Sequence, residues 1–292
     1  MKKILTCDIG GTDLKYGIIG IDGTFLFNSS EPTKAKEGGK AIISQIVNFY
    51  LSLKEQYDIS GIAISSAGII DPNTTIVLDA TNAITDYIGI NIRDEINKFV
   101  NIPVSVENDV NCMALCESSF GSGINAKSMI AITIGTGIGG AIVLDGHLFH
   151  GNGFSAGEWG NMRINNAIYE QIASTKALVL SAQKVYPNIR NGVEVFKLYD
   201  SNDPLIIPVV ESFFDNLSTG IANIIYSFNP EKLIIGGGIT ARGEKFLTEL
   251  ISYIKPKVSN YVFNKTEILL AHHKNNAGMI GALTNFLQQN NF

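Results

Sequence analysis

The stretch Asp8-Ile9-Gly10-Gly11-Thr12-Asp13-Leu14-Lys15 joins two short β-branched runs near the start of the chain. Glycines in such a turn allow several backbone N–H groups to converge on an anion. Thr12 adds a hydroxyl donor and Lys15 a positive charge, while Asp8, at the end of a buried strand, suits a place near Mg²⁺. The stretch therefore predicts a phosphate-binding turn. An ordinary tight hairpin, with Asp8 bonded to the turn's own amides, is the alternative that the local sequence leaves open.

A second glycine turn, Gly135-Thr136-Gly137-Ile138-Gly139-Gly140, follows an apolar strand predicted over residues 129–134. It matches G-x-G-x-x-G, and Glu158 lies near the spacing that a dinucleotide-binding fold requires. That fold needs a helix directly after the turn. Here the apolar run 141–144 leads into Asp145-Gly146, a hairpin signal. We therefore predict a second phosphate-binding hairpin and reject the dinucleotide interpretation.

The two turns belong to a partial internal repeat. Gly17-Ile18-Ile19-Gly20-Ile21-Asp22-Gly23 recurs as Gly140-Ala141-Ile142-Val143-Leu144-Asp145-Gly146. Each copy follows an apolar strand and a glycine-rich turn, which predicts two related halves with a cleft between them. Chance similarity of two Asp-Gly hairpins is the alternative, and the repeat alone does not decide.

Length and composition limit the class of protein. The chain has 292 residues, of which 45% are hydrophobic and 17% charged, which excludes a disordered chain and is enough for two domains. Its 22 Lys+Arg against 27 Asp+Glu exclude an extended basic surface for nucleic acid. No window approaches the roughly 18 apolar residues of a membrane span, and the first apolar run stops too early for a signal peptide. We expect a cytoplasmic protein without a nucleic-acid or membrane partner.

The cysteines and histidines give no metal or disulfide signal. Three cysteines without a C-x-x-C pair favour a reducing compartment. The four histidines (His147, His150, His272 and His273) lack metal-ligand spacing, so we interpret them as structural or surface residues.

Strand-like and helix-like segments alternate along the chain, which predicts an α/β fold. Strands are expected at 3–9, 16–21, 61–64, 104–106, 129–134, 141–144 and 233–235, and helices at 41–57, 110–117, 166–184, 206–228 and 278–289. Gly121-Ser122-Gly123 marks the expected boundary between an N-terminal domain, residues 1–118, and a C-terminal domain, residues 119–277. The closing helix, within residues 278–292, is expected to pack back on the first domain.

Glu107-Asn108-Asp109 ends one predicted strand and begins a helix. A carboxylate there can accept the proton of an alcohol that attacks a γ-phosphate. Asn and Asp are also the preferred N-cap residues, so a cap is the alternative, and the two roles do not exclude each other.

Two further glycine-rich stretches point to ligand contacts. Gly236-Gly237-Gly238 follows a buried strand and would let adenine or ribose approach the backbone, although a turn leading into a helix explains it nearly as well. In Gly157-Glu158-Trp159-Gly160-Asn161, Glu158 and Asn161 can hydrogen-bond vicinal hydroxyls, and Trp159 can pack beneath a sugar ring. The alternatives are a core tryptophan and a solvated glutamate, and local sequence favours a surface charge at Glu170.

Taken in order, these motifs resemble the ROK family (repressors, open reading frames and kinases), from Asp8 to Ala277-Gly278-Met279-Ile280-Gly281-Ala282. The resemblance implies the two-domain actin-like ATPase and sugar-kinase (ribonuclease H-like) α/β fold. It further implies ATP and Mg²⁺ in an interdomain cleft, a sugar phosphorylated at its 6-hydroxyl, and a homodimer. The family also contains sugar-responsive transcriptional regulators, but these carry a DNA-binding domain before the first motif, and we expect none before Asp8 here.

The resemblance also assigns roles to individual residues. Asp109 matches the catalytic base. ATP and its phosphates are expected at Asp8, Gly10, Gly11, Thr12, Lys15, Gly135, Thr136, Gly137, Gly236 and Gly237. The sugar is expected at Gly68, Asn82, Asn108, Asp109, Glu158, Asn161 and Glu170.

One departure from the family bears on metal and substrate. Members usually have a zinc-binding His where Asn161 stands, followed by a C-x-C-G-x-x-G-C loop, whereas this chain runs from Asn161 to Glu170 without a cysteine. We therefore expect no structural zinc. Zinc-less members include N-acetylmannosamine kinases of sialic-acid breakdown and β-glucoside kinases. The segments Ile64-Ser65-Ser66-Ala67-Gly68 and Tyr169-Glu170-Gln171-Ile172-Ala173-Ser174 look more like the former, with a glucokinase or β-glucoside kinase as the alternative.

Overall fold

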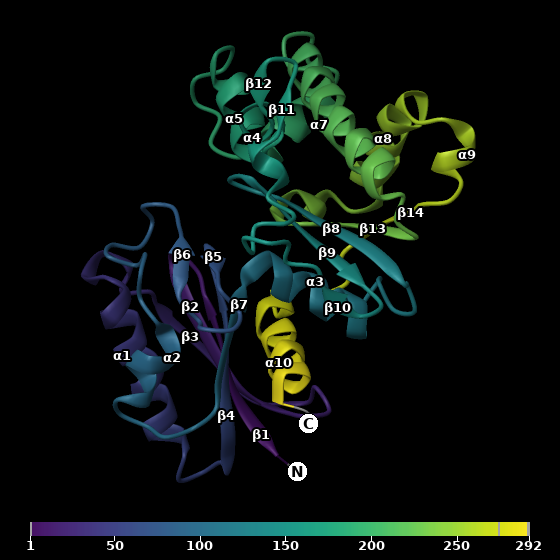
Figure 1. The fold of residues 1–292 in the computed structure, drawn as a ribbon. Coiled ribbons are helices and arrows are strands. Elements are labelled where there is room, and N and C mark those ends of the chain that lie inside the picture. Colours follow the sequence, from purple (N-terminus) through teal and green to yellow (C-terminus); the bar gives the residue numbers. More distant parts are fainter. Residues whose placement is uncertain (1, 274, 291–292) are drawn as a thin grey trace. The chain divides into compact units, whose positions relative to one another are not determined.

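The computed structural model describes residues 2–273 and 275–290. The chain divides into two compact units, coloured along the sequence in Figure 1. Unit 1 comprises Met1–Ser119, His150–Ser155 and Asn275–Phe292, and unit 2 comprises Phe120–Phe149 and Ala156–Lys274. Residues 150–155, which the sequence analysis assigned to the second domain, thus belong to unit 1.

Unit 1 is built on a five-stranded sheet in the order β3-β2-β1-β4-β7. Its strands are β1 (Lys3–Ile9), β2 (Asp13–Gly20), β3 (Phe25–Pro32), β4 (Ile59–Ser66) and β7 (Val104–Asn108). β1 pairs antiparallel with β2 and parallel with β4, and β4 pairs parallel with β7. A small hairpin of β5 (Ile69–Ile70) and β6 (Val77–Asp79) follows β4.

Helices cover both faces of this sheet, which explains why its central strands are apolar on both sides. Figure 1 shows α1 (Gly39–Leu53) and α2 (Ile92–Asn97) on one face and α10 (Ala277–Asn290) on the other. α10 packs on β1 and β4 through a buried cluster that includes Ile4, Ala63 and Phe286. α3 (Asp109–Phe120) starts directly at the end of β7.

Unit 2 has a sheet of the same design, in the order β10-β9-β8-β13-β14. Its strands are β8 (Ser128–Ile134), β9 (Ile138–Leu144), β10 (His147–Leu148), β13 (Lys232–Gly236) and β14 (Glu267–Leu270). Its helices are α4 (Tyr169–Ala173), α5 (Thr175–Gln183), α6 (Gly192–Asp200), α7 (Ile207–Phe228), α8 (Glu244–Ile254) and α9 (Asn260–Phe263). A two-stranded ladder of β11 (Arg163–Ile164) and β12 (Ala167–Ile168) precedes α4. The short 3₁₀ helices η1 (Ala35–Glu37), η2 (Trp159–Asn161), η3 (Gly238–Arg242) and η4 (Lys255–Lys257) complete the two units.

The α/β class is confirmed, whereas the single helix predicted over 166–184 is wrong. This segment forms β12, α4 and α5, and the break falls at Ser174, whose backbone is extended at ψ 163°. The Ser174 hydroxyl accepts a hydrogen bond from Ala177 N at 3.1 Å and so caps α5. Within the residues described, no helix is both long and apolar enough to cross a membrane.

Candidate functional site

The first glycine turn connects β1 and β2 and is held by Thr33, the residue after β3. Gly10 N donates to Asp13 O at 3.1 Å, which closes the turn. Thr33 donates from its backbone N to Thr12 O at 2.8 Å and from its hydroxyl to Gly10 O at 2.7 Å. A Cβ added at Gly11 would meet no atom within 4 Å, so this side of the turn is open. The phosphate-binding role of this turn stays a prediction.

Asp8 is fixed at the end of β1 by side chains rather than by amides of the turn, within the part of the chain that the structure describes. Ser65 Oγ donates to its Oδ1 at 2.7 Å, and Lys15 Nζ lies 3.5 Å from its Oδ2. Lys15 also donates to Asn275 O at 3.0 Å. The backbone of Gly278, in the first turn of α10, lies so close that an added Cβ would come within 2.5 Å of Oδ1. The carboxylate is therefore oriented, yet 19% of its side chain stays accessible.

The carboxyl ends of the parallel neighbours β4 and β7 bring Gly68 and Asn108 together. Asn108 Nδ2 donates to Gly68 O at 2.9 Å. Gly68 has φ +101°, and a Cβ there would lie 2.6 Å from Asp79 O, so the position requires glycine. Asn108 Oδ1 accepts from the backbone N of Val110 at 2.8 Å and of Asn111 at 3.0 Å, so Asn108 caps α3.

Asp109 is the first residue of α3 and is exposed, with Oδ1 accepting from Val110 N at 2.9 Å. Its charge also reaches the buried Tyr87. Burial raises the pKa of Tyr87 to about 12; a hydrogen bond with Ser66 opposes this rise and the charge of Asp109 adds to it. Since Asn108 provides the cap, Asp109 is placed at the strand–helix junction without being needed for that role.

The second glycine turn, between β8 and β9, is held by α4 and α5. Gly135 N donates to Gly137 O at 3.0 Å, and Lys176 N donates to Gly135 O at 3.3 Å. Glu170 Oε2 accepts from Ile138 N at 3.3 Å, and a Cβ at Gly137 would overlap the same oxygen. Glu170 is therefore a half-buried residue that packs against the turn, not the surface charge that local sequence favoured.

A groove in unit 2 runs from this turn to an apolar end. One part has a volume of about 570 Å³ and the other about 420 Å³, and Thr175, Asn191, Gly192 and Gly238 line both. The residues at the end near the turn include Gly135, Thr136, Lys176 and Arg190. The residues at the other end include Val193, Phe196, Ile239 and Arg242.

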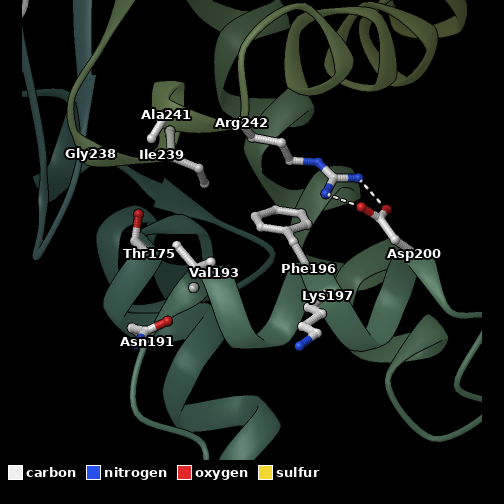
Figure 2. Close-up of a pocket in the computed structure, with 11 residues that line it drawn as sticks. Thr175, Asn191, Val193, Phe196, Lys197, Asp200, Gly238, Ile239, Ala241 and Arg242 are labelled. Atoms are coloured by element: carbon white, nitrogen blue, oxygen red, sulfur yellow. Dashed lines mark hydrogen bonds and ion pairs between the residues drawn. The ribbon is translucent and has the colours of Figure 1, made fainter.

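Figure 2 shows the apolar end of the groove, where the Arg242 side chain extends over the Phe196 ring. The guanidinium carbon lies 4.3 Å from the ring centroid. Arg242 donates to both carboxylate oxygens of Asp200 at 2.9 and 2.7 Å and to Glu249 at 2.8 Å. This network fixes the wall of the pocket, because a bidentate pair constrains the guanidinium plane. The groove thus has the glycine turn, Lys176 and Arg190 at one end and the Phe196 ring with Val193 and Ile239 at the other.

The three glycines after β13 have different positions. Gly236 is the last residue of the strand, and Gly237 has φ +91°, where a Cβ would overlap the backbone of Ile134. Gly238 lines the groove, and a Cβ there would meet no atom within 4 Å. Of this cluster, Gly238 and not the predicted Gly236 and Gly237 forms the groove wall.

The remaining predicted sugar ligands lie in loops. Glu158 and Asn161 are exposed at the two ends of η2, and Asn161 N donates to Glu158 O at 3.2 Å. Trp159 lies against Gly140 and edge-on against Phe228, with ring centroids 5.3 Å apart, so its indole belongs to the packing of unit 2. Asn82 is exposed in the loop that follows β6.

Sequence reasoning missed two residues next to the predicted base. Glu107 is buried one residue before Asn108, and its Oε2 lies 2.8 Å from His150 Nε2. Only the Glu-Asn-Asp run signalled Glu107, and no local pattern signalled His150. In residues 2–273 and 275–290, no group of three or more His, Cys, Asp or Glu side chains is arranged to hold a metal ion.

The comparisons with known proteins cover nearly the whole chain. Residues 4–289 match the ROK family. A β-glucoside kinase of Listeria innocua is 35% identical over 300 residues, which cover 99% of both chains. A solved structure from Listeria monocytogenes, described as "a putative N-acetylmannosamine kinase", has a TM-score of 0.88 and 32% identity and covers 98% of this chain and 99% of its own. A ROK glucokinase from Streptomyces griseus, solved with glucose and AMPPNP, has a TM-score of 0.81 and 26% identity, with 96% and 98% of the chains covered. The chain therefore belongs to the ROK family and is a sugar kinase with the two-domain actin-like fold.

Proposed function

We propose that this chain transfers the γ-phosphate of ATP to the 6-hydroxyl of a hexose-type sugar, with Asp109 as the base. The observation that carries the proposal is the groove of unit 2, because its two ends match the two ends of ATP. The apolar end at Val193, Phe196 and Ile239 suits a flat base. The end at Gly135, Thr136 and Lys176 suits a phosphate chain, since backbone amides and a cation meet there.

Unit 1 also offers groups that can bind phosphate. The open turn at Gly10, Gly11 and Thr12 offers backbone and hydroxyl donors, and Lys15 adds a positive charge. A single oriented carboxylate such as Asp8 suits Mg²⁺, which usually keeps water and substrate phosphates as its other ligands. When bound with ATP, the ion would neutralise charge on the phosphates.

Asp109 is assigned the proton transfer. As the 6-hydroxyl oxygen bonds to the γ-phosphorus, its proton passes to the Asp109 carboxylate, the bond from phosphorus to the β–γ bridging oxygen breaks, and ADP leaves. We assign the orientation of the sugar to Asn108 and Gly68, which are joined by a hydrogen bond beside Asp109. Such positioned acid–base groups contribute roughly 10²- to 10⁴-fold to a rate.

N-acetylmannosamine is the first candidate for the sugar, and the sequence segments around Gly68 and Glu170 support it. The similar Listeria monocytogenes structure, described as a putative kinase of this sugar, agrees with that choice. A β-glucoside is the second candidate, because kinases named for β-glucosides are 35% and 34% identical over nearly full length. Sequence identity favours this second candidate, so the assay below includes both.

The test is ADP release with ATP and MgCl₂ across N-acetylmannosamine, N-acetylglucosamine, glucose, mannose, fructose and cellobiose. We expect strong turnover with N-acetylmannosamine; a preference for cellobiose would transfer the assignment to the second candidate. Asp109→Asn should lower kcat by about 100-fold or more while calorimetry still detects sugar binding. Asp58→Asn, at an exposed aspartate of unit 1, is the control and should change nothing. Near-normal turnover of Asp109→Asn would remove the assigned base.

A further inference from the structure

Glu107 is a buried carboxylate beside the proposed base, with three donors around it. Its Oε1 accepts from Asn108 N and from Asn111 Nδ2, both at 2.8 Å. Its Oε2 lies 2.8 Å from His150 Nε2. Only 1% of the Glu107 side chain is exposed. Burial of a carboxylate is costly unless hydrogen bonds satisfy its oxygens, as these three contacts do.

His150 approaches Glu107 from a short segment with an unusual path. Residues His150–Ser155 belong to unit 1, although the chain before and after them belongs to unit 2. Burial lowers the pKa of His150, but the hydrogen bond with Glu107 and its charge outweigh this effect and raise the pKa above its ordinary value. The imidazole ring of His150 also lies edge-on to the ring of Phe154, with 6.3 Å between the ring centroids. The imidazole is thus held as a donor to Glu107.

The contacts of Glu107 involve the residues on either side of Asp109, the proposed base. The amide that it binds belongs to Asn108, whose side chain caps α3 and binds Gly68 O. Asn111, its second donor, lies in the first turn of α3. Asp109 is between these two anchored residues. One carboxylate therefore fixes the peptide on both sides of the proposed base.

We propose that His150 is a positioning residue for phosphoryl transfer, whose hydrogen bond to Glu107 holds the junction of residues 107–111 in the reactive arrangement. The proposal rests on the proposed function, because it takes Asp109 as the base. His150 acts through Glu107. A merely structural His150 would change stability and leave the rate of the folded protein unaltered.

Substituting His150 by Gln or by Asn, whose side-chain amides differ in length, distinguishes a positioning role from a merely structural one. His150→Gln keeps a donor at about the reach of Nε2, whereas His150→Asn has the same chemistry but is one methylene too short. We expect His150→Asn to lower kcat about tenfold or more, since small displacements of catalytic groups are costly. The KM for ATP should change less than about twofold, because the groove of unit 2 is untouched. His150→Gln should recover kcat to within about threefold of the unaltered protein.

Amide hydrogen exchange measures the order of the junction at residues 107–111 without depending on turnover. Amides in the peptide covering residues 104–113 should exchange faster in His150→Asn than in His150→Gln. His147→Asn, at an exposed histidine of β10, is the control and should match the unaltered protein in rate and exchange. If His150→Asn does not fold, His150→Phe fills the ring's space without a donor and is read in the same way.

Three results would overturn the proposal: normal kcat in His150→Asn whatever its exchange, a His150→Gln as slow as His150→Asn, or equal exchange in the two variants. If the unaltered chain phosphorylates no sugar of the panel, the proposed function fails by itself. The exchange comparison then still decides whether His150 holds the junction, and equal exchange in the two variants would refute it.

Discussion

The sheets of units 1 and 2 have the same strand order and the same sequence of antiparallel and parallel neighbours. Asp8 and Thr133 occupy corresponding positions, each followed by an isoleucine and a glycine turn. On the neighbouring parallel strand, Asp8 pairs with Ser65 and Thr133 with Gly236. The sequence repeat therefore marks two copies of one scaffold whose turn chemistry differs.

The difference lies in where each unit keeps its charges. In unit 1 they lie at the carboxyl ends of the strands, at Asp8 and Asp109, with Lys15 beside the turn. In unit 2 the strand end has Thr133 in place of Asp8, the charges near the glycine turn (Glu170, Lys176) come from helices α4 and α5, and the Arg242–Asp200 network is at the far end of the groove. We infer that charges in unit 1 serve turnover, whereas this network serves stability and the shape of the nucleotide pocket.

Separate substitutions at the two corresponding positions, Asp8 and Thr133, should give the largest difference in kcat. Asp8→Asn keeps an acceptor for Ser65 but loses the charge, and we expect kcat to fall about 100-fold. The partly exposed pair with Lys15 is worth about 1 kcal/mol or less, so the melting temperature should barely move. Thr133→Val should leave kcat within about threefold, because it changes no charge. Steady-state kinetics with thermal unfolding measure both, and an equal loss in Thr133→Val would refute the contrast.

A substitution that fills the groove should give a smaller effect, which is confined to the KM for ATP. A Cβ added at Gly238 would meet no protein atom within 4 Å, and Gly238 lines both parts of the groove. We expect Gly238→Val to raise the KM for ATP about tenfold, as an ill-fitting methyl group typically does. The KM for the sugar and the melting temperature serve as internal controls and should not change. An unaltered KM for ATP would mean that the base binds outside this groove.

The features that the sequence predicted correctly are those encoded by adjacent residues. The glycine turns and the strand–helix junction at Asp109 depend on local backbone chemistry, so a few consecutive residues indicate them. The helix over 166–184 failed because its apolar spacing continues across Ser174, and the same serine favours a cap as readily as a helix interior. The strand β3 was missed because most of its residues are exposed and polar, which gives no buried-strand pattern.

Long-range contacts explain the errors at the site. Glu170 reads as a surface charge until the fold brings Ile138 and Gly137, 32 and 33 positions away, against its carboxylate. Similarly, His150 meets Glu107 across 43 positions. No spacing rule covers such pairs, since they depend on how separate strands and loops pack. The same holds for Trp159, whose place in the packing follows from the bare surface at Gly140.

The smallest expected effect tests whether the charged network of unit 2 is structural. Hydrogen bonds from Arg242 lower the pKa of Asp200 from 3.8 to about 2, against the opposing effect of burial, and Lys245 adds to the lowering. A lowered pKa stabilises the folded state at pH values above 3.8, and this stabilisation disappears as the pH falls through about 2. Because 36% of the Asp200 side chain is exposed, we expect only about 0.5–1 kcal/mol.

Asp200→Asn should therefore unfold more easily than the unaltered protein at pH 7, and the two unfolding curves should converge near pH 2. Chemical denaturation at several pH values measures this difference, with Asp58→Asn as the control for loss of an exposed carboxylate. The kcat of Asp200→Asn should stay normal, since its network shapes the wall of the groove and contacts no reacting atom. A variant that keeps its stability but loses turnover would reverse the division of labour between the two units. Such a result would mean that Asp200, in unit 2, contributes to the chemical step and not only to stability.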